Sequence, residues 1–139
     1  MILLDTSGLL AAIDGNQWHH PACAAALLAA APPRLLCPFV LAELDYLLAT
    51  QVGSPAQLAL LDEVARGAYR LEPFGAIDVA AARDVAARYA DLGVGLADAS
   101  IVVLAARHDT RDVLTFDERH FRAMRALDRK RFRLLPADR

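Results

Sequence analysis

The sequence has little cysteine, glycine or proline, and each shortage excludes a class of protein. Among 139 residues there are two cysteines, seven glycines and seven prolines. Cys23 and Cys37 lie in apolar sequence and are too few for a disulfide framework, so we expect buried thiols in a reducing compartment. The glycine and proline contents exclude collagen-like and low-complexity chains. With 56% hydrophobic and 23% charged residues, residues 1–139 are predicted to fold as a single domain.

The sequence also lacks a long apolar run. Its longest, residues 22–31, is well short of the roughly 20 residues that a membrane helix needs. The first residues have neither the basic start nor the apolar stretch of a secretory signal. We therefore expect a soluble, cytoplasmic protein that makes no contact with a membrane.

Charge is balanced overall but not along the chain. The net charge is -2, yet residues 119–139 hold eight basic and two acidic side chains. Arg119, Arg122 and Arg125 recur at three-residue spacing in this region and could form a basic stripe that contacts an RNA backbone. The alternative is an ordinary solvated helix face. The nine aromatic residues are scattered, so no base-stacking platform is predicted.

Short apolar segments alternate with helical ones. The segments that favour strands are 2–4, 35–37, 69–72, 112–115 and 132–135. The segments that favour helices are 9–13, 21–30, 38–50, 54–67, 77–92, 96–108 and 118–127. This alternation predicts a three-layer α/β fold, with a mostly parallel sheet of four to five short strands flanked by helices. In such a sheet the ligand site lies beyond the carboxyl ends of the strands, where the strand order reverses.

Several catalytic motifs are absent. The chain contains no GxGxxG, no GxxxxGK[ST] and no GxSxG pattern, which argues against a nucleotide cofactor and against acyl transfer. His19, His20 and Cys23 lack a fourth ligand at a spacing usable for zinc. The remaining candidates are carboxylates.

Four carboxylates occupy unusual positions. Asp5 directly follows the first predicted strand, and Asp117 follows the strand at 112–115 by two residues. Glu43 has apolar neighbours three and four residues away in both directions, so it is predicted to point along an apolar stripe. Asp98 precedes Ile101 on the helix face expected to pack against the sheet. Each of the three aspartates could instead cap or start a helix.

A divalent cation would explain such a cluster. An unpaired carboxylate on a packed face costs several kcal/mol, and no basic residue within a turn of Glu43 or Asp98 could form a helical salt bridge. Oxygen ligands without nearby thiolates favour Mg²⁺ or Mn²⁺ over Zn²⁺. Such a centre suits the attack of a metal-activated water on a phosphodiester.

Four segments carry a family resemblance across essentially the whole chain. The sequences LLDTSGLLAAID, PFVLAELDYLL, LGVGLADASIVVLAARH and VLTFDERHFRAM, in this order, resemble the motifs of PIN-domain proteins, in particular VapC-type toxins of toxin-antitoxin modules. The resemblance implies a PIN-like fold. It also implies metal-binding and catalytic roles for the same four acids, Asp5, Glu43, Asp98 and Asp117, with Thr6 and Thr115 as supporting residues.

The resemblance also implies an activity and partners. The expected activity is that of an Mg²⁺-dependent endoribonuclease, with Mn²⁺ as a possible substitute, acting on structured tRNA or rRNA. The expected partners are a second copy of the chain and a small VapB-type antitoxin in the active-site groove, with DNA bound only through the antitoxin. Two alternatives stay open: a non-catalytic module that binds the antitoxin and an operator, and a phosphohydrolase that uses an aspartate nucleophile.

Overall fold

Five short parallel strands form the centre of the computed structural model, which describes residues 1–139. They are β1 (Ile2–Leu4), β2 (Arg34–Leu36), β3 (Arg70–Leu71), β4 (Asp112–Leu114) and β5 (Arg133–Leu135). Every neighbouring pair is parallel. The predicted α/β class and parallel sheet are therefore confirmed.

The strand order places β1 in the middle of the sheet. The order is β3-β2-β1-β4-β5, so the chain first builds one half of the sheet and then returns to build the other. Leu3 pairs with Leu35 of β2 on one side and with Val113 of β4 on the other. The strand order reverses between β1 and β4, and Asp5 and Thr115 directly follow these two strands. The predicted ligand position is thus at the carboxyl ends of β1 and β4.

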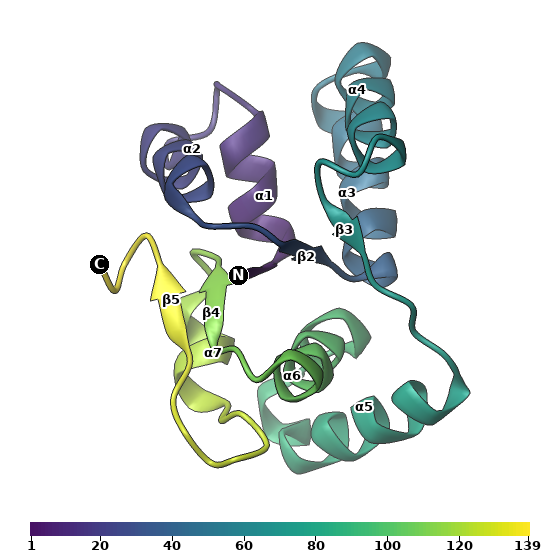
Figure 1. The fold of residues 1–139 in the computed structure, drawn as a ribbon, viewed down its shortest axis with the longest axis vertical. Coiled ribbons are helices and arrows are strands. Elements are labelled where there is room, and N and C mark those ends of the chain that lie inside the picture. The colour runs from purple at the N-terminus through teal and green to yellow at the C-terminus, as the bar shows by residue number, and fades with distance from the viewer.

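Helices cover both faces of the sheet. They are α1 (Thr6–Ile13), α2 (His20–Ala29), α3 (Pro38–Gln51), α4 (Ser54–Ala65), α5 (Ala76–Arg88), α6 (Leu96–His108) and α7 (Glu118–Ala123), with a 3₁₀ turn η1 (Ala90–Leu92) before α6. In Figure 1, α1 and α2 lie on one side of the sheet, and α5 and α6 pack together on the other. This arrangement is the three-layer architecture that the alternation predicts.

Two predicted helices are too long. The segment 77–92 was expected to be one helix, but α5 ends at Arg88 and the chain continues as η1. The last predicted helix, 118–127, ends at Ala123. The segments that follow the two shortened helices contact each other, since the backbone N–H of Arg125 donates to the Tyr89 hydroxyl. Met124 and Ala126 are buried beside that bond, and a continuous helix could not place both inward.

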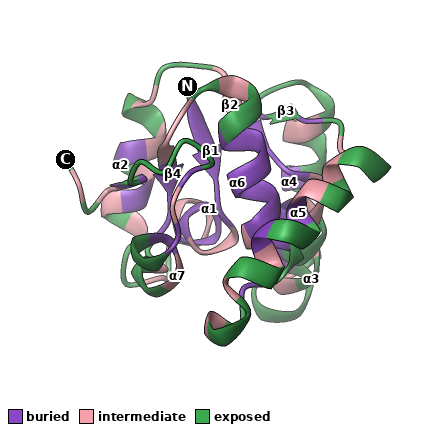
Figure 2. Cartoon of the chain, turned by 90° about the horizontal axis from the view of Figure 1, so that it is seen from below, coloured by how far each residue is buried: buried purple, intermediate pink, exposed green.

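The core lies at the sheet and along α6. A single cluster of 31 buried hydrophobic residues includes all of β1 and most of α6 (Figure 2). The two cysteines are buried and free, as predicted. No helix has the length and apolar character needed to cross a bilayer. The fold therefore holds the ends of β1 and β4 on a rigid, fully packed base.

Gly8 allows α1 to pack against the end of β4. A Cβ atom at this position would collide with the Leu114 carbonyl oxygen and would lie 2.8 Å from the Thr115 nitrogen. Gly8→Ala is therefore expected to lower the free energy of unfolding by about 1–3 kcal/mol, the usual cost of overpacking, despite alanine's better helix propensity. Urea unfolding measures this loss. Gly15→Ala, which meets nothing within 4 Å, is the control, and equal stabilities for the two variants would contradict this packing.

Candidate active site at the ends of the central strands

The four predicted carboxylates line one cavity. Asp5 follows β1, Glu43 lies in α3, Asp98 in the first turn of α6, and Asp117 immediately before α7. All four border a cavity of about 440 Å³, together with Thr6 and other residues of these segments. The structure thus brings together side chains from four distant parts of the sequence.

Asp5 is a buried carboxylate of this groove. Its side chain is only 5% exposed, and its Oδ2 accepts hydrogen bonds from the hydroxyls of Ser7 (2.8 Å) and Thr115 (2.7 Å). Burial raises the pKa of Asp5 to about 6, although these two hydrogen bonds oppose the shift. Asp5 occupies the N-cap position of α1 but makes no capping hydrogen bond. Helix capping therefore does not account for this carboxylate.

Thr115 belongs to a compact hydroxyl network. Its hydroxyl lies 3.0 Å from that of Ser7 and accepts the backbone N–H of Asp117 at 2.9 Å. One threonine therefore contacts Asp5 and also orients the chain at Asp117. Thr115 thus lies between two of the acids, and its supporting role stays a prediction.

Glu43 differs from its prediction. Its side chain is exposed at the groove and does not lie along a buried stripe. The buried face of α3 is formed by Val40, Leu44 and Leu48, and Glu43 lies about 100° around the helix from Leu44. The Thr6 hydroxyl donates to its Oε2 at 2.7 Å, so Thr6 orients this acid and not Asp5.

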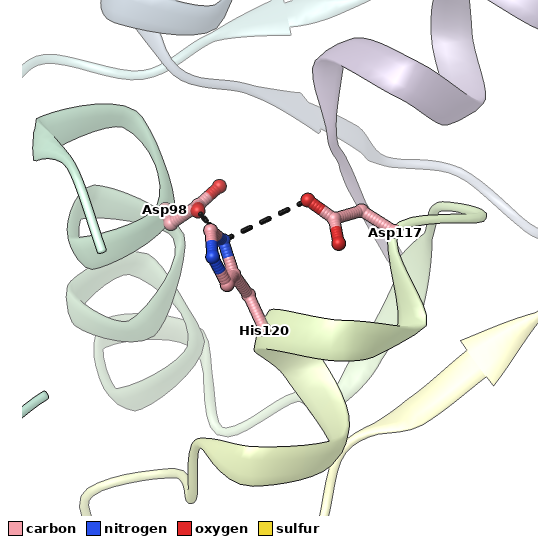
Figure 3. A group of neighbouring side chains, drawn as sticks. All are labelled: Asp98, Asp117 and His120. Carbon is pink, nitrogen blue, oxygen red and sulfur yellow. Dashed lines mark hydrogen bonds and ion pairs between the residues drawn. The ribbon is translucent and has the colours of Figure 1, made fainter. Parts of the chain in front are cut away.

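His120 is a site residue that the sequence did not reveal. Figure 3 shows its ring between Asp98 and Asp117. The Nδ1 atom lies 2.7 Å from Asp98 Oδ2 and 3.7 Å from Asp117 Oδ2, and Nε2 lies 3.0 Å from the Leu92 carbonyl oxygen. Because both ring nitrogens face acceptors, the geometry suits an imidazolium that donates twice. The hydrogen bond to Asp98 raises the pKa of His120.

The cluster is electrostatically unfavourable without a counterion. Burial raises the pKa of Asp98, and repulsion from Asp117 and Glu43 adds to the shift despite the bond to His120. Ligand atoms of Asp98, Asp117 and His120 lie within 4.8 Å of one another. Carboxylate oxygens dominate the groove, and no thiol borders it. This donor set fits a hard divalent cation.

The basic residues lie differently from the expected stripe. Arg122 pairs with Asp138 through two 2.6 Å hydrogen bonds and with Glu118 at 3.2 Å. Arg125 donates to backbone carbonyls. Only Arg119 is exposed without a partner. Of the three arginines of the expected stripe, Asp138 thus neutralises Arg122, whereas Arg119 and Arg125 have no acidic partner. Contact of these arginines with RNA stays a prediction.

Much of the basic excess lies away from the groove. Arg133 begins β5 and pairs in register with Asp112 at the start of β4, whereas the acids follow the ends of β1 and β4. The basic segment 129–131 directly precedes β5. It therefore lies at the opposite edge of the sheet from the acidic groove.

Comparisons with known proteins agree on one family. The PIN domain family matches residues 2–127. Ribonuclease VapC26 of Mycobacterium tuberculosis is 43% identical over 135 residues, covering 97% of this chain and 100% of that protein. The structure of Mycobacterium tuberculosis VapC20, described as a sarcin-ricin loop cleaving toxin, superposes with a TM-score of 0.78 at 20% identity, over 84% of this chain and 90% of the other. FitAcB of Neisseria gonorrhoeae gives 0.62 at 25% identity, over 95% and 96%.

The buried Asp5 predicts a pH-dependent stability in metal-free protein. Because its pKa is raised to about 6 on folding, the native state binds this proton more tightly than the unfolded chain does. Stability should therefore fall as pH rises from about 4 to about 6. Asp5→Asn keeps an oxygen for the two hydroxyls and removes the buried charge. It should raise the free energy of unfolding at pH 7 by up to about 2 kcal/mol.

Chemical unfolding in EDTA at pH 5 and pH 7 tests this expectation. Asp91→Asn, in the exposed η1 turn, serves as the control and should leave stability unchanged at both values. An Asp5→Asn variant that is less stable than the wild type at pH 7 would show that the carboxylate is not destabilising in the folded state.

Proposed function

The chain belongs to the PIN-domain family as a homologue of the VapC ribonuclease toxins, and from that premise we propose that the four acids of the groove form its catalytic centre. One observation carries the proposal. Carboxylates from four separate segments line a single cavity, and the two at N-cap positions, Asp5 and Asp117, make no capping hydrogen bond. Burial, with a smaller contribution from repulsion between the acids, raises the pKa values of Asp5 and Asp98, so the arrangement has no structural benefit of its own.

We propose that the acids hold Mg²⁺, with Mn²⁺ able to replace it. When bound, the cation supplies the positive charge that activates a water molecule and stabilises charge on the scissile phosphate. The neighbouring residues hold these acids in position. Ser7 and Thr115 fix the carboxylate of Asp5, and Thr6 orients Glu43 across the groove. His120 holds the side chain of Asp98 next to Asp117.

The proposed substrate is structured RNA, such as tRNA or rRNA. VapC20 is described as cleaving the sarcin-ricin loop, and VapC26 is named a ribonuclease. Arg119 is exposed and unpaired two residues after Asp117, so its guanidinium is free to neutralise a backbone phosphate near the acids. This contact is the part of the predicted basic stripe that is retained in the proposal.

We propose that residues 1–139 act as one PIN domain in the cytoplasm, with a small VapB-type antitoxin as partner. The domain is also proposed to form a homodimer and to contact DNA only through the antitoxin. Apolar side chains that face solvent support protein partners, since exposed apolar surface is typical of interfaces. The most exposed aliphatic ones are Ile77 (88%), Leu28 (78%) and Leu58 (57%).

Cleavage of total tRNA and rRNA by antitoxin-free protein tests the proposed activity. With Mg²⁺, the wild type should produce discrete fragments that disappear in EDTA. Asp98→Asn should cut at least about 100-fold more slowly, because even the outer partners of metal ligands typically contribute 10- to 100-fold. Mg²⁺ should also raise the melting temperature of the wild type but not of this variant.

Asp62→Asn is the matched control, since it removes an exposed acid of α4 outside the groove. It should cut RNA as the wild type does. Cleavage that persists in folded Asp98→Asn, or in EDTA, would contradict the proposed centre. A folded wild type that binds Mg²⁺ but cuts neither RNA would favour a non-catalytic module, and turnover of small phosphate esters would favour a phosphohydrolase.

A further inference from the structure

A second cavity adjoins the acidic groove. It has a volume of about 590 Å³, and His19, Ala22, Phe116, Pro136 and Arg139 are among its lining residues. Phe116 borders both this cavity and the acidic groove. The side chain of Phe116 therefore forms a wall shared by the two cavities. Phe116 directly precedes Asp117 in the sequence.

The shared wall is a stacked pair of rings. The rings of His19 and Phe116 have centroids 4.5 Å apart and an interplanar angle of 28°. Phe116 nevertheless stays 37% exposed, and Trp18, next to His19, is 90% exposed. Leaving large aromatic side chains in water forgoes the stabilisation that burial would give them. The exposure of Phe116 at the border of both cavities indicates a surface that another flat ring can cover.

On the premise of the proposed ribonuclease function, we propose that the His19–Phe116 stack is a platform for an unpaired RNA base next to the scissile phosphate. Aromatic faces bind bases of any identity by stacking, and RNA is most often read through bases that are splayed out of its helices. A phosphate held in the groove through the proposed cation would have its neighbouring nucleotide close to Phe116, since this ring borders both cavities. This proposal differs from the expectation that the scattered aromatic residues form no stacking platform, because the fold brings His19 and Phe116 together.

The charges of the second cavity are compatible with a nucleotide. Arg139 lines it and uses one nitrogen to donate to the Ala22 carbonyl at 3.2 Å, which leaves other N–H donors of its guanidinium. Glu118 also lines the cavity, and its carboxylate shares Arg122 with Asp138, so it adds a negative charge there. The platform therefore has a cation available for the next phosphate of the strand.

Binding of RNA without cleavage tests the platform. All proteins keep the four acids, and Ca²⁺, which also takes oxygen ligands, replaces Mg²⁺. The probe is a short fluorescein-labelled single-stranded RNA whose integrity is checked on a gel, and its binding is followed by anisotropy. Phe116→Leu should weaken binding on the order of tenfold, whereas Phe116→Tyr, which keeps the ring, should bind normally. Tyr46→Leu removes a 68% exposed aromatic residue of α3 that borders neither cavity, and it should bind as the parent does.

A scan of abasic RNAs separates stacking from general damage. Removing one particular base should weaken binding to the parent as much as Phe116→Leu does, and should cause no further loss in the Phe116→Leu protein. Trp18 is the only tryptophan, so its emission offers a second readout. Its change on RNA binding should disappear with the same abasic probe.

The outcomes separate the platform from the proposed activity. If the wild type cuts RNA but no abasic probe loses affinity, or if the losses from Phe116→Leu and base removal add, the platform is wrong and the nuclease stands. If Phe116→Leu changes only self-association or antitoxin binding, the stack belongs to a protein interface and the platform is overturned. If the protein neither cuts nor binds RNA, both proposals fail.

Discussion

The structure depends on one costly arrangement, a carboxylate buried at the carboxyl ends of two neighbouring strands. Asp5 directly follows β1 and donates its backbone N–H to the Leu114 carbonyl of β4 at 3.1 Å, so its position is set by the sheet. Its charge is stabilised by hydrogen bonds from the hydroxyls of Ser7 and Thr115, two residues that lie far apart in the sequence. Gly8 permits that approach, since α1 starts in contact with the end of β4. The residues at the ends of β1 and β4 therefore determine both the packing of the fold and the position of the site.

The other acids add to this cost. Each carboxylate brought to the groove disfavours the ionised form of the next, and the one internal cation, His120, is shared between Asp98 and Asp117 (Figure 3). His120 is held in turn by the Leu92 carbonyl, which lies at the end of η1, where backbone carbonyls have no partner within the helix. Such local destabilisation is typical of functional sites, where binding of a ligand, here the proposed cation, stabilises the folded state.

Part of this arrangement could be predicted from the sequence, and the remainder shows where local rules fail. Alternating apolar segments determine strand and helix positions, and the carboxyl-end rule selects Asp5 and Asp117 because parallel strands end at one edge. The predicted direction of the Glu43 side chain was wrong because neighbouring side chains on a helix point in directions that differ by about 100°. His120, the Arg122–Asp138 pair and the His19–Phe116 contact each join separate segments. No periodicity within one segment encodes such contacts.

The most direct test of the central claim is the position of a bound cation. A crystal structure of the antitoxin-free protein with Mn²⁺, recorded at a wavelength where manganese scatters anomalously, would locate the ion without reference to activity. The account predicts an anomalous peak within coordination distance of carboxylate oxygens of Asp5 and Asp98, with Asp117 or Glu43 completing the site directly or through water. A fully occupied peak elsewhere, with the groove empty at millimolar Mn²⁺, would contradict it.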